Sequence, residues 1–317
     1  MNAVGAQELR EAIRQAALGL GFSRVGFTGA DPLPEAQQRR WERWFAQDKA
    51  GVMGWLARRQ PRRTHPRDLM PEAQTAIVVA AGYRDGDHPE PPPEAIGKIA
   101  RYAWGRDYHA VLREKLDDLA ARISEAAGED VRHLACVDSK PIDERGLAAR
   151  AGLGFIGKNT LLIDPAGGSW AVLGVLLVNL ALPPDEPARS AATSCGSCRR
   201  CLEACPTGAI TGPYALDPRR CISYLTIETR GDIPPELAAN MQGWAFGCDI
   251  CQEVCPFNAQ PLARAFPDLA ASAGAGPYVT KAMLGDSGKG FLRKFGHTPL
   301  ARTGLKGLRR FDKFLDV

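Results

Sequence analysis

The chain has 317 residues, of which 45% are hydrophobic and 24% charged, the balance of a globular protein with room for roughly two domains. Its formal net charge of +4 excludes a strong attraction of the whole surface to nucleic acid. Any contact with nucleic acid therefore has to rest on local basic patches.

The first 22 residues predict an amphipathic helix. They contain no basic region followed by an uninterrupted apolar one, so we expect no signal peptide. The longest apolar run, 170–182, is shorter than the ~18 residues of a membrane span. We therefore expect a cytoplasmic protein without membrane contact, in a compartment where disulfides are disfavoured.

Alternating patterns continue along the first half of the chain. Strands are predicted at 24–28 and 75–83, and the acidic, proline-rich segment 85–94 predicts an exposed connection. A strong helical pattern follows at 107–127, then a short strand at 131–137. These elements predict an α+β domain.

The domain continues with a short helix at 143–151, with Pro141 near its start. Strands at 160–164 and 169–180 are joined by Pro165-Ala-Gly-Gly, which predicts a hairpin. We expect this first domain to end near residue 187. A cysteine-rich part and a basic helical tail follow it.

Eight of the nine cysteines form two groups with related spacing. The first is Cys195-x2-Cys198-x2-Cys201-x3-Cys205-Pro206, and the second is Cys221 followed by Cys248-x2-Cys251-x3-Cys255-Pro256. In the C-x2-C-x2-C-x3-C-P pattern, three cysteines bind one iron–sulfur cluster and the fourth binds the other. Eight thiolates are what two cubane clusters need.

The pattern therefore predicts crossed ligand sets. The first cluster takes Cys195, Cys198, Cys201 and Cys255, and the second takes Cys205, Cys221, Cys248 and Cys251. The alternative is two zinc sites, but zinc ligands are usually spaced in pairs separated by a longer loop. Triplets that end in Cys-Pro favour iron–sulfur clusters, and the domain is expected to carry electrons.

Three further features have structural interpretations. Cys136 lies in an apolar strand and is expected to be a small core residue. The segment AGLGFIGKN (151–159) nearly matches a phosphate loop, but Asn159 replaces the Ser or Thr that binds Mg²⁺, so its glycines are expected to allow a close approach to something flat or bulky. In DYHAVL (107–112), His109 is expected to be a surface or packing residue.

Beyond single motifs, the chain resembles the epoxyqueuosine reductase family over nearly its whole length. The resemblance is carried by GVMGWLARR (51–59), RYAWGRDYH (101–109), VDSKPIDERGLAARAGLGFIGKNTLLI (137–163), GSW (168–170), RRCISYLTIE (219–228), FGCDICQEVCPFN (246–258) and FGHTPLARTGLKGLRR (295–310). It is most specific in the VDS…ER…GKNT block together with CISYLTIE. Some members of the family carry a further C-terminal helical-repeat domain.

The resemblance implies an α+β protein in three parts. These are an N-terminal α/β cobalamin-binding catalytic domain with a mixed sheet and flanking helices (1–187), a ferredoxin-like domain with two [4Fe-4S] clusters (188–260), and a helical basic C-terminal segment (261–317). The implied reaction reduces epoxyqueuosine at the wobble position of tRNA to queuosine, with loss of water. Such a reaction needs two electrons, a partner for carbon and a proton for the departing oxygen.

Asp138 occupies the family's proton-donor position. The residues alone favour another role, because Asp138 follows a strand and precedes a helix that it could cap. Beside a large apolar corrin, its carboxyl group would be desolvated, and its pKa would rise.

Within the matched motifs we predict a set of residues around the corrin, whose alternative is plain core packing for the apolar members. They are Arg58, Arg101, Asp138, Lys158, Asn159, Leu162, Trp170, Leu173, Ser223 and Thr226.

Two basic runs are candidates for phosphate contacts with tRNA. RRQPRRTHPR (58–67) holds five arginines and no acid, and residues 289–313, which include Arg309 and Arg310, hold eight Lys or Arg against Asp312 alone. The modified base is expected to be turned out of its stack. We also expect an external low-potential electron donor of the flavodoxin or ferredoxin type, and a monomer.

Three other functions stay open at this point. A cobalamin- and iron–sulfur-dependent reductive dehalogenase shares the implied cofactors but usually carries a twin-arginine export signal. A ferredoxin-type electron carrier would need neither the large first domain nor the basic tail. A zinc-bound RNA-binding module is the third.

Overall fold

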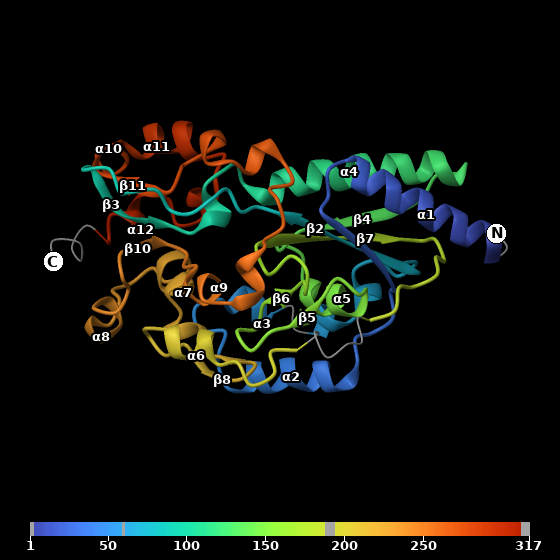
Figure 1. Ribbon diagram of the computed structural model, residues 1–317, viewed down its shortest axis with the longest axis horizontal. Helices are drawn as coiled ribbons and strands as arrows, with labels where there is room; N and C mark the ends of the chain where they lie inside the picture. Colours follow the sequence, from blue (N-terminus) through green and yellow to red (C-terminus); the bar gives the residue numbers. More distant parts are fainter. Residues whose placement is uncertain (1–2, 59–60, 188–193, 312–317) are drawn as a thin grey trace.

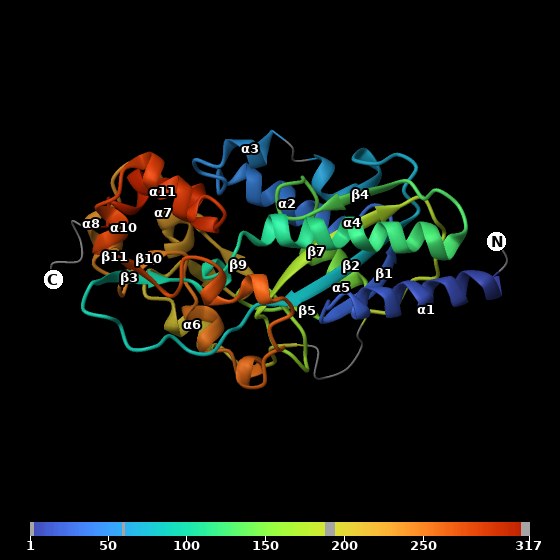
Figure 2. The same cartoon turned by 90° about the horizontal axis from the view of Figure 1, so that it is seen from above.

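The computed structural model describes residues 3–58, 61–187 and 194–311. Two parts lie side by side along the long axis of the molecule (Figures 1 and 2). One is built around a four-stranded sheet, and the other gathers the cysteine-rich segment and the C-terminal helices. The predicted α+β class is confirmed, since helices pack on a main sheet whose strands are antiparallel.

The four-stranded sheet has the order β1-β2-β7-β4 and is antiparallel throughout. Its strands are β1 (Arg24–Gly29), β2 (Thr75–Gly82), β4 (His133–Cys136) and β7 (Ala171–Val178). All eight residues of β2 are buried, as expected for a central strand covered on both faces. The predicted strands at 24–28 and 75–83 are thus confirmed.

Helices cover both faces of this sheet, as Figure 1 shows. On one face, α1 (Ala3–Gly19) and α4 (Tyr108–Ala127) pack against side chains such as Phe27 and Ile77. On the other, α5 (Glu144–Arg150) packs against the alternate residues of the same strands. The period of two along the strands therefore supplies two separate cores.

The second part contains the mixed pairing. In its three-stranded sheet, β3 (Ala95–Ile99) pairs in parallel with β10 (Trp244–Phe246) and antiparallel with β11 (Tyr278–Thr280). The segment around β3 thus packs with one strand just before the Cys248 triplet and one strand after it, across both predicted domain limits at 187 and 260. The three-part division stays a prediction, and this sheet is the place where the parts join.

The predicted hairpin at Pro165 is wrong. The residues before the turn form β6 (Leu162–Ile163), which pairs with β5 (Phe155–Ile156) instead of β7. Only an isolated bridge between Asp164 and Gly168 closes the turn. β7 pairs with β2 along its whole length on one edge and with β4 along residues 175–178 on the other, while β6 pairs with β5 in a separate sheet.

The remaining elements are short. The helices are α2 (Glu35–Ala46), α3 (Gly54–Ala57), α6 (Arg200–Ala204), α7 (Ile222–Ile227), α8 (Pro235–Ala238), α9 (Ile250–Glu253), α10 (Lys281–Leu284), α11 (Gly288–Phe295) and α12 (Gly304–Leu308). The strands are β8 (Ile210–Gly212) and β9 (Ala215–Leu216). The 3-10 turns are η1 (Pro61–Thr64), η2 (Pro66–Asp68), η3 (Arg101–Ala103), η4 (Pro218–Arg220), η5 (Pro256–Ala259), η6 (Pro267–Leu269), η7 (Ala271–Ala273) and η8 (Pro299–Arg302).

None of the helices in the described ranges has the length and apolar character that crossing a bilayer requires.

Candidate active site and cysteine centres

The two cysteine motifs meet in space because α6 and α9 pack against each other. Four thiols line one small cavity of about 20 Å³, and they come from both motifs: Cys195, Cys198, Cys201 and Cys255. Burial raises the pKa of the Cys201 thiol, and the other three thiols of this set raise it further. Cys255 thus lies with the first three cysteines of the other motif.

A second set collects the other four cysteines. Burial raises the pKa of Cys248, and the nearby Cys221 and Cys205 add to the shift. Burial also raises the pKa of the Cys251 thiol, and the charges of Cys248 and Cys221 raise it further. Cys205 therefore lies with the second motif, so each set has the composition that the crossed pattern predicts.

The spacing of the sulfur atoms favours clusters over zinc. Within the described chain, only His88, Asp249 and Glu253 bring three possible ligand atoms within 4.8 Å of one another. Four thiolates at ~2.3 Å from one zinc ion would be only about 3.8 Å apart. The described cysteines are too widely spaced for such a site, whereas a cubane cluster holds its four ligands farther apart.

The surroundings of the first set also fit a sulfur-rich group. The Lys158 N–H donates to Cys195 Sγ at 3.4 Å, and the Lys158 ammonium donates to the carbonyls of Gly196 and Cys198. Asn159 is 5% exposed and lines the same cavity, but its Nδ2 has no partner among the described residues. A buried amide without a partner is costly, and a cluster sulfide would supply the missing acceptor.

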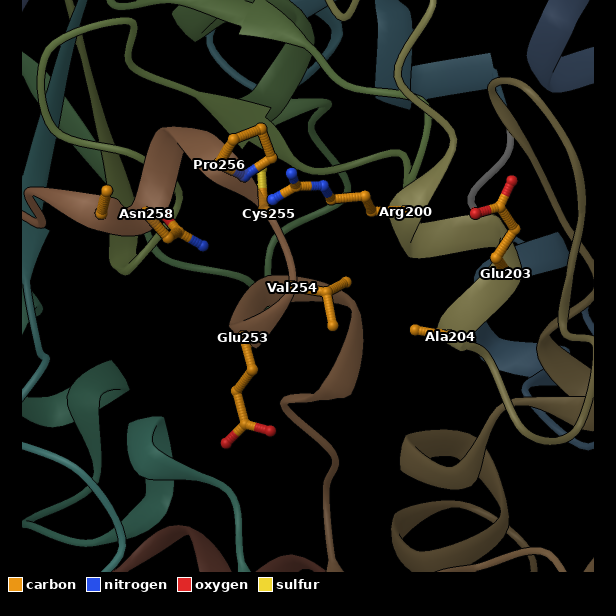
Figure 3. A pocket seen from close by; sticks show the side chains of 9 residues that line it. Arg200, Glu203, Ala204, Glu253, Val254, Cys255, Pro256 and Asn258 are labelled. Atoms are coloured by element: carbon orange, nitrogen blue, oxygen red, sulfur yellow. The ribbon is translucent and has the colours of Figure 1, made fainter.

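A larger hollow of about 680 Å³ opens beside Cys255. Figure 3 shows Arg200 and Glu203 on α6 on one side of it, with Glu253 and Cys255 on the other. Its lining mixes charged side chains with apolar ones such as Val254 and Pro256. It brings the surface of the molecule close to the first cysteine set.

Asp138 lies at the end of β4, at the junction of the two parts of the molecule. Its φ of +49° is unusual for a residue with a side chain. The Asp138 N–H donates to Glu144 Oε1 at 2.6 Å, and its side chain is 60% exposed. Asp138 does not cap α5, since Asp143 fills that position by accepting from the Gly146 N–H. The capping alternative is thus wrong.

Two side chains from the start of α4 reach the Asp138 carboxylate. The Tyr108 hydroxyl and His109 Nε2 both lie 3.2 Å from Oδ2. On its other side, His109 Nδ1 lies 2.7 Å from Asp107 Oδ1. Asp107 also caps α4 by accepting from the His109 N–H, so the helix start fixes the position of the imidazole.

The pKa of Asp138 was expected to be raised, and it is instead lowered. Desolvation raises the pKa of Asp138, but the hydrogen bond and charge of His109 outweigh it, and the net pKa lies below its ordinary value. Burial lowers the pKa of His109, but the hydrogen bonds to Asp107 and Asp138 outweigh this effect and raise the pKa to about 9. These opposite shifts favour a proton on His109 over one on Asp138 near neutral pH.

Glu144 holds a second proton close by. Desolvation raises the pKa of Glu144, and repulsion from Asp138 adds to the shift, which brings it to about 8. Sequence reasoning missed both His109 and Glu144. His109 was expected on the surface or in packing, yet it stands in the matched RYAWGRDYH motif, which was the available signal.

An apolar cavity of about 80 Å³ gathers two of the predicted corrin residues. Leu162 from β6 and Leu173 from β7 line it together with Leu153 and Ala171. Arg145 lies on its rim and also lowers the pKa of Asp138 by its charge. The lining fits the edge of a large apolar macrocycle, since it combines an apolar floor with a few polar groups.

Arg101 and Trp170 have internal partners. Arg101 is 4% exposed and pairs with Asp249 at 3.1 Å and with Glu253 at 2.7 Å. Its guanidinium lies 5.0 Å from the centre of the Trp170 ring. Arg101 therefore ties the first part of the molecule to the segment between Cys248 and Cys255.

The last three predicted corrin residues lie apart from the apolar cavity. Thr226 is fully buried, and its hydroxyl is occupied by Ile222 O and by the Gly247 N–H. Ser223 is half-buried in α7, and Arg58 is exposed after α3. Arg101 and Thr226 thus act within the protein, and a contact with a cofactor is the weaker interpretation for both.

Several basic side chains have structural roles. Arg63 is buried and lies 5.5 Å from the Trp41 ring and 5.9 Å from the Trp55 ring. The guanidinium groups of Arg309 and Arg310 donate to backbone carbonyls, Arg309 to Leu284. Arg59 and Lys313 lie outside the described residues. The two runs are therefore only partly available to a polyanion.

Cys136 and the glycine-rich segment 151–159 both have packing roles. Cys136 is fully buried, and burial raises the pKa of its thiol to about 12, so its expected core role is confirmed. In 151–159, Gly154 has a φ of +157°, and a Cβ there would lie 2.2 Å from Ile163 O. The close approach that this glycine allows is thus to the chain's own β6.

Two family models match the chain. The one described as a 4Fe-4S double cluster binding domain covers residues 194–258, and the one described as "Epoxyqueuosine reductase QueG, DUF1730" covers residues 63–139. The first confirms the predicted two-cluster domain. The second contains both His109 and Asp138. Which cysteine binds which cluster stays a proposal.

Individual relatives match over most of the chain. Epoxyqueuosine reductase of Synechococcus sp. (strain RCC307) is 44% identical over 254 residues, which is 79% of this chain and 76% of the relative. That of Cellulophaga algicola is 37% identical over 312 residues, 96% of each chain. A crystal structure of epoxyqueuosine reductase with a tRNA-Tyr epoxyqueuosine-modified stem loop matches at 32% identity with a TM-score of 0.86, over 97% of this chain and 80% of that one.

Proposed function

The chain belongs to the epoxyqueuosine reductase family, and we propose that it reduces epoxyqueuosine to queuosine at the wobble position of tRNA. One observation carries this proposal: the chain matches over nearly its whole length a relative structure that is solved with the modified tRNA stem loop. The two cysteine sets and the exposed carboxyl group of Asp138 supply the electron and proton chemistry that the reaction needs.

The proposed cofactors are a cobalamin and two [4Fe-4S] clusters. When bound, the clusters supply electrons one at a time, and the reduced cobalt supplies a partner for the epoxide carbon. The eight cysteines would hold the clusters in the crossed sets, with Lys158 and Asn159 donating to the first. Leu162 and Leu173 would contact the apolar part of the cobalamin.

The task of Asp138 is to give a proton to the departing epoxide oxygen. Its carboxylate is exposed at the junction of the two parts, and Glu144 holds its backbone in a strained conformation. Strain that is held by specific partners is a recurrent feature of functional sites. Arg145 would help to position the Asp138 carboxylate by its charge, since it lines the apolar cavity and lowers the pKa of Asp138.

The partners follow from the same site. The substrate is tRNA that carries epoxyqueuosine, with its base turned out into the site. The hollow beside Cys255 offers a flavodoxin- or ferredoxin-type donor a route to the first cluster. We further propose a monomeric protein that works in the cytoplasm.

The direct test uses anaerobic protein loaded with both clusters and cobalamin. After chemical reduction, it is incubated with an epoxyqueuosine-containing stem loop, and the nucleosides are analysed by mass spectrometry. We expect the epoxyqueuosine to lose one oxygen atom, and no conversion by protein without cobalamin. Fully loaded, reduced protein that leaves the nucleoside unchanged would overturn the proposal.

A further inference from the structure

We propose that His109 supplies the proton that Asp138 passes to the departing oxygen, and that Asp107 holds the imidazole in position for this task. The inference rests on the proposed function and deepens it. His109 acts through Asp138 and does not itself touch the substrate. It rests on two side-chain contacts in series, from Asp107 to His109 and from His109 to Asp138.

Both ring nitrogens of His109 are engaged. Nδ1 lies 2.7 Å from Asp107 Oδ1, and Nε2 lies 3.2 Å from Asp138 Oδ2. A carboxylate on one imidazole nitrogen fixes the ring orientation and stabilises the imidazolium form. The chain thus presents a proton on Nε2 directly to the carboxylate that needs one.

The two oxygens of Asp138 have different surroundings. The contacts of Tyr108 and His109 both fall on Oδ2, and no described residue donates a side-chain hydrogen bond to Oδ1. Oδ1 is therefore left for the substrate. The N–H bond of His109 breaks as an O–H bond forms at Oδ2, and the carboxyl group, neutral for that step, gives this proton to the leaving oxygen and returns to the carboxylate. His109 is 32% exposed, so solvent can reprotonate it afterwards.

Other charged and titratable groups face this pair from each neighbouring element. They are Tyr102, Tyr108, Glu144, Arg145, Arg63 and Arg302. Burial raises the pKa of the two tyrosines, so they keep their protons. The arginines stabilise the Asp138 carboxylate, whereas Glu144 opposes it. Tyr108 and His109 both hold a proton and contact the side chain of Asp138, but burial raises the pKa of Tyr108 well above its ordinary value, so only His109, with a pKa of about 9, readily gives its proton up.

A purely structural role for His109 is the competing explanation. The ring stacks on Tyr108 with centroids 4.2 Å apart, and the His109 backbone accounts for the cap of α4. Removing the ring could therefore disturb the helix start. The two roles differ in pH dependence, because packing does not titrate and a proton source does.

The test compares His109→Gln with Tyr108→Phe in single-turnover reactions of the reduced, fully loaded protein between pH 6 and 9. Both variants remove one hydrogen bond from Oδ2, but only the first removes a titratable proton. For the wild type we expect a rate that stays level and declines as the pH passes about 9. For His109→Gln we expect a rate that falls roughly tenfold per pH unit, because Asp138 must then be protonated directly. Tyr108→Phe keeps the wild-type profile.

Nitrogen-15 NMR of the histidines in the cluster-loaded protein gives a readout independent of turnover. The His109 signal, identified by its loss in the Gln variant, should titrate well above the ordinary value of ~6.5, and Asp138→Asn should lower that pKa. An ordinary pKa, or a Gln variant with the wild-type pH profile, would overturn the inference. His109→Asn repeats the test if the Gln variant loses its clusters. A wild type without any turnover contradicts the proposed function, while the NMR titration still decides on the proton chain.

Discussion

Asp138 unites three properties that no other described carboxylate combines. It has a positive φ, an exposed side chain, and a backbone N–H held by the half-buried carboxyl group of Glu144. A left-handed conformation costs on the order of 1 kcal/mol or more for a residue with a Cβ. Such a conformation persists only where its surroundings enforce it, and here they place the carboxylate where a substrate can reach it.

Asp138→Asn is expected to separate chemistry from structure. Asparagine tolerates the left-handed region and can still accept from Tyr108, so the fold and both clusters should persist. It has no acidic proton, so turnover of the modified tRNA should fall by roughly 10²–10⁴-fold. Single-turnover rates and melting temperatures are measured on the same preparation. A stable variant with full activity would exclude Asp138 as the proton donor.

Across elements, the contact between α6 and α9 decides the pairing of the cysteine motifs. Each helix is only four or five residues long and follows directly on its first motif cysteines. Their packing brings Cys255 to the first set and Cys205 to the second. Sets that each depend on both motifs make the two clusters structurally interdependent.

The crossed ligation is tested with four single alanine variants. Cys255→Ala should reproduce the Mössbauer and EPR spectra of Cys195→Ala, because both remove a ligand of the first cluster. Cys205→Ala is the matched control and should instead reproduce Cys248→Ala. If Cys255→Ala instead resembles Cys248→Ala, and Cys205→Ala resembles Cys195→Ala, the assignment is wrong.

At the scale of the whole molecule, the C-terminal segment reaches the site. Arg302 in η8 pairs with Glu228 at 2.9 Å, and this hydrogen bond raises the Arg302 pKa, to which the charge of Asp138 adds. The helices α11 and α12 pack on η8 and carry the exposed Arg293 and Lys306. These side chains, and not the backbone-bound Arg309 and Arg310, are the candidates for phosphate contacts.

The double variant Arg293→Gln and Lys306→Gln should weaken tRNA binding and lower the slope of log affinity against log salt by roughly 1.5, the contribution of two phosphate contacts. Arg309→Gln is the control. It should leave the slope unchanged and lower the melting temperature, because it removes hydrogen bonds to Leu284 and Asp286. Equal slopes for the double variant and the wild type would exclude the tail from tRNA binding.

The sequence by itself determined the elements whose signals are local. The helix at 107–127 and the strands at 24–28 and 75–83 follow from apolar periodicity, which needs no knowledge of distant residues. The triplet spacing that ends in Cys-Pro likewise predicted two clusters, because this spacing of cysteine ligands is typical of iron–sulfur clusters. The carboxyl group at 138 was found through its motif.

Tertiary structure alone decided how distant residues combine. The partner of β6 depended on which edges of β7 were free, so the turn at Pro165 could not reveal it. The internal partners of Arg101, Arg309 and Arg310 followed from packing across the molecule, which charge runs do not encode. His109 reads as an ordinary surface residue until the start of α4 is brought against the end of β4. A hydrogen bond between residues 29 positions apart depends on the fold, and it is this contact that turns a histidine into a proton source.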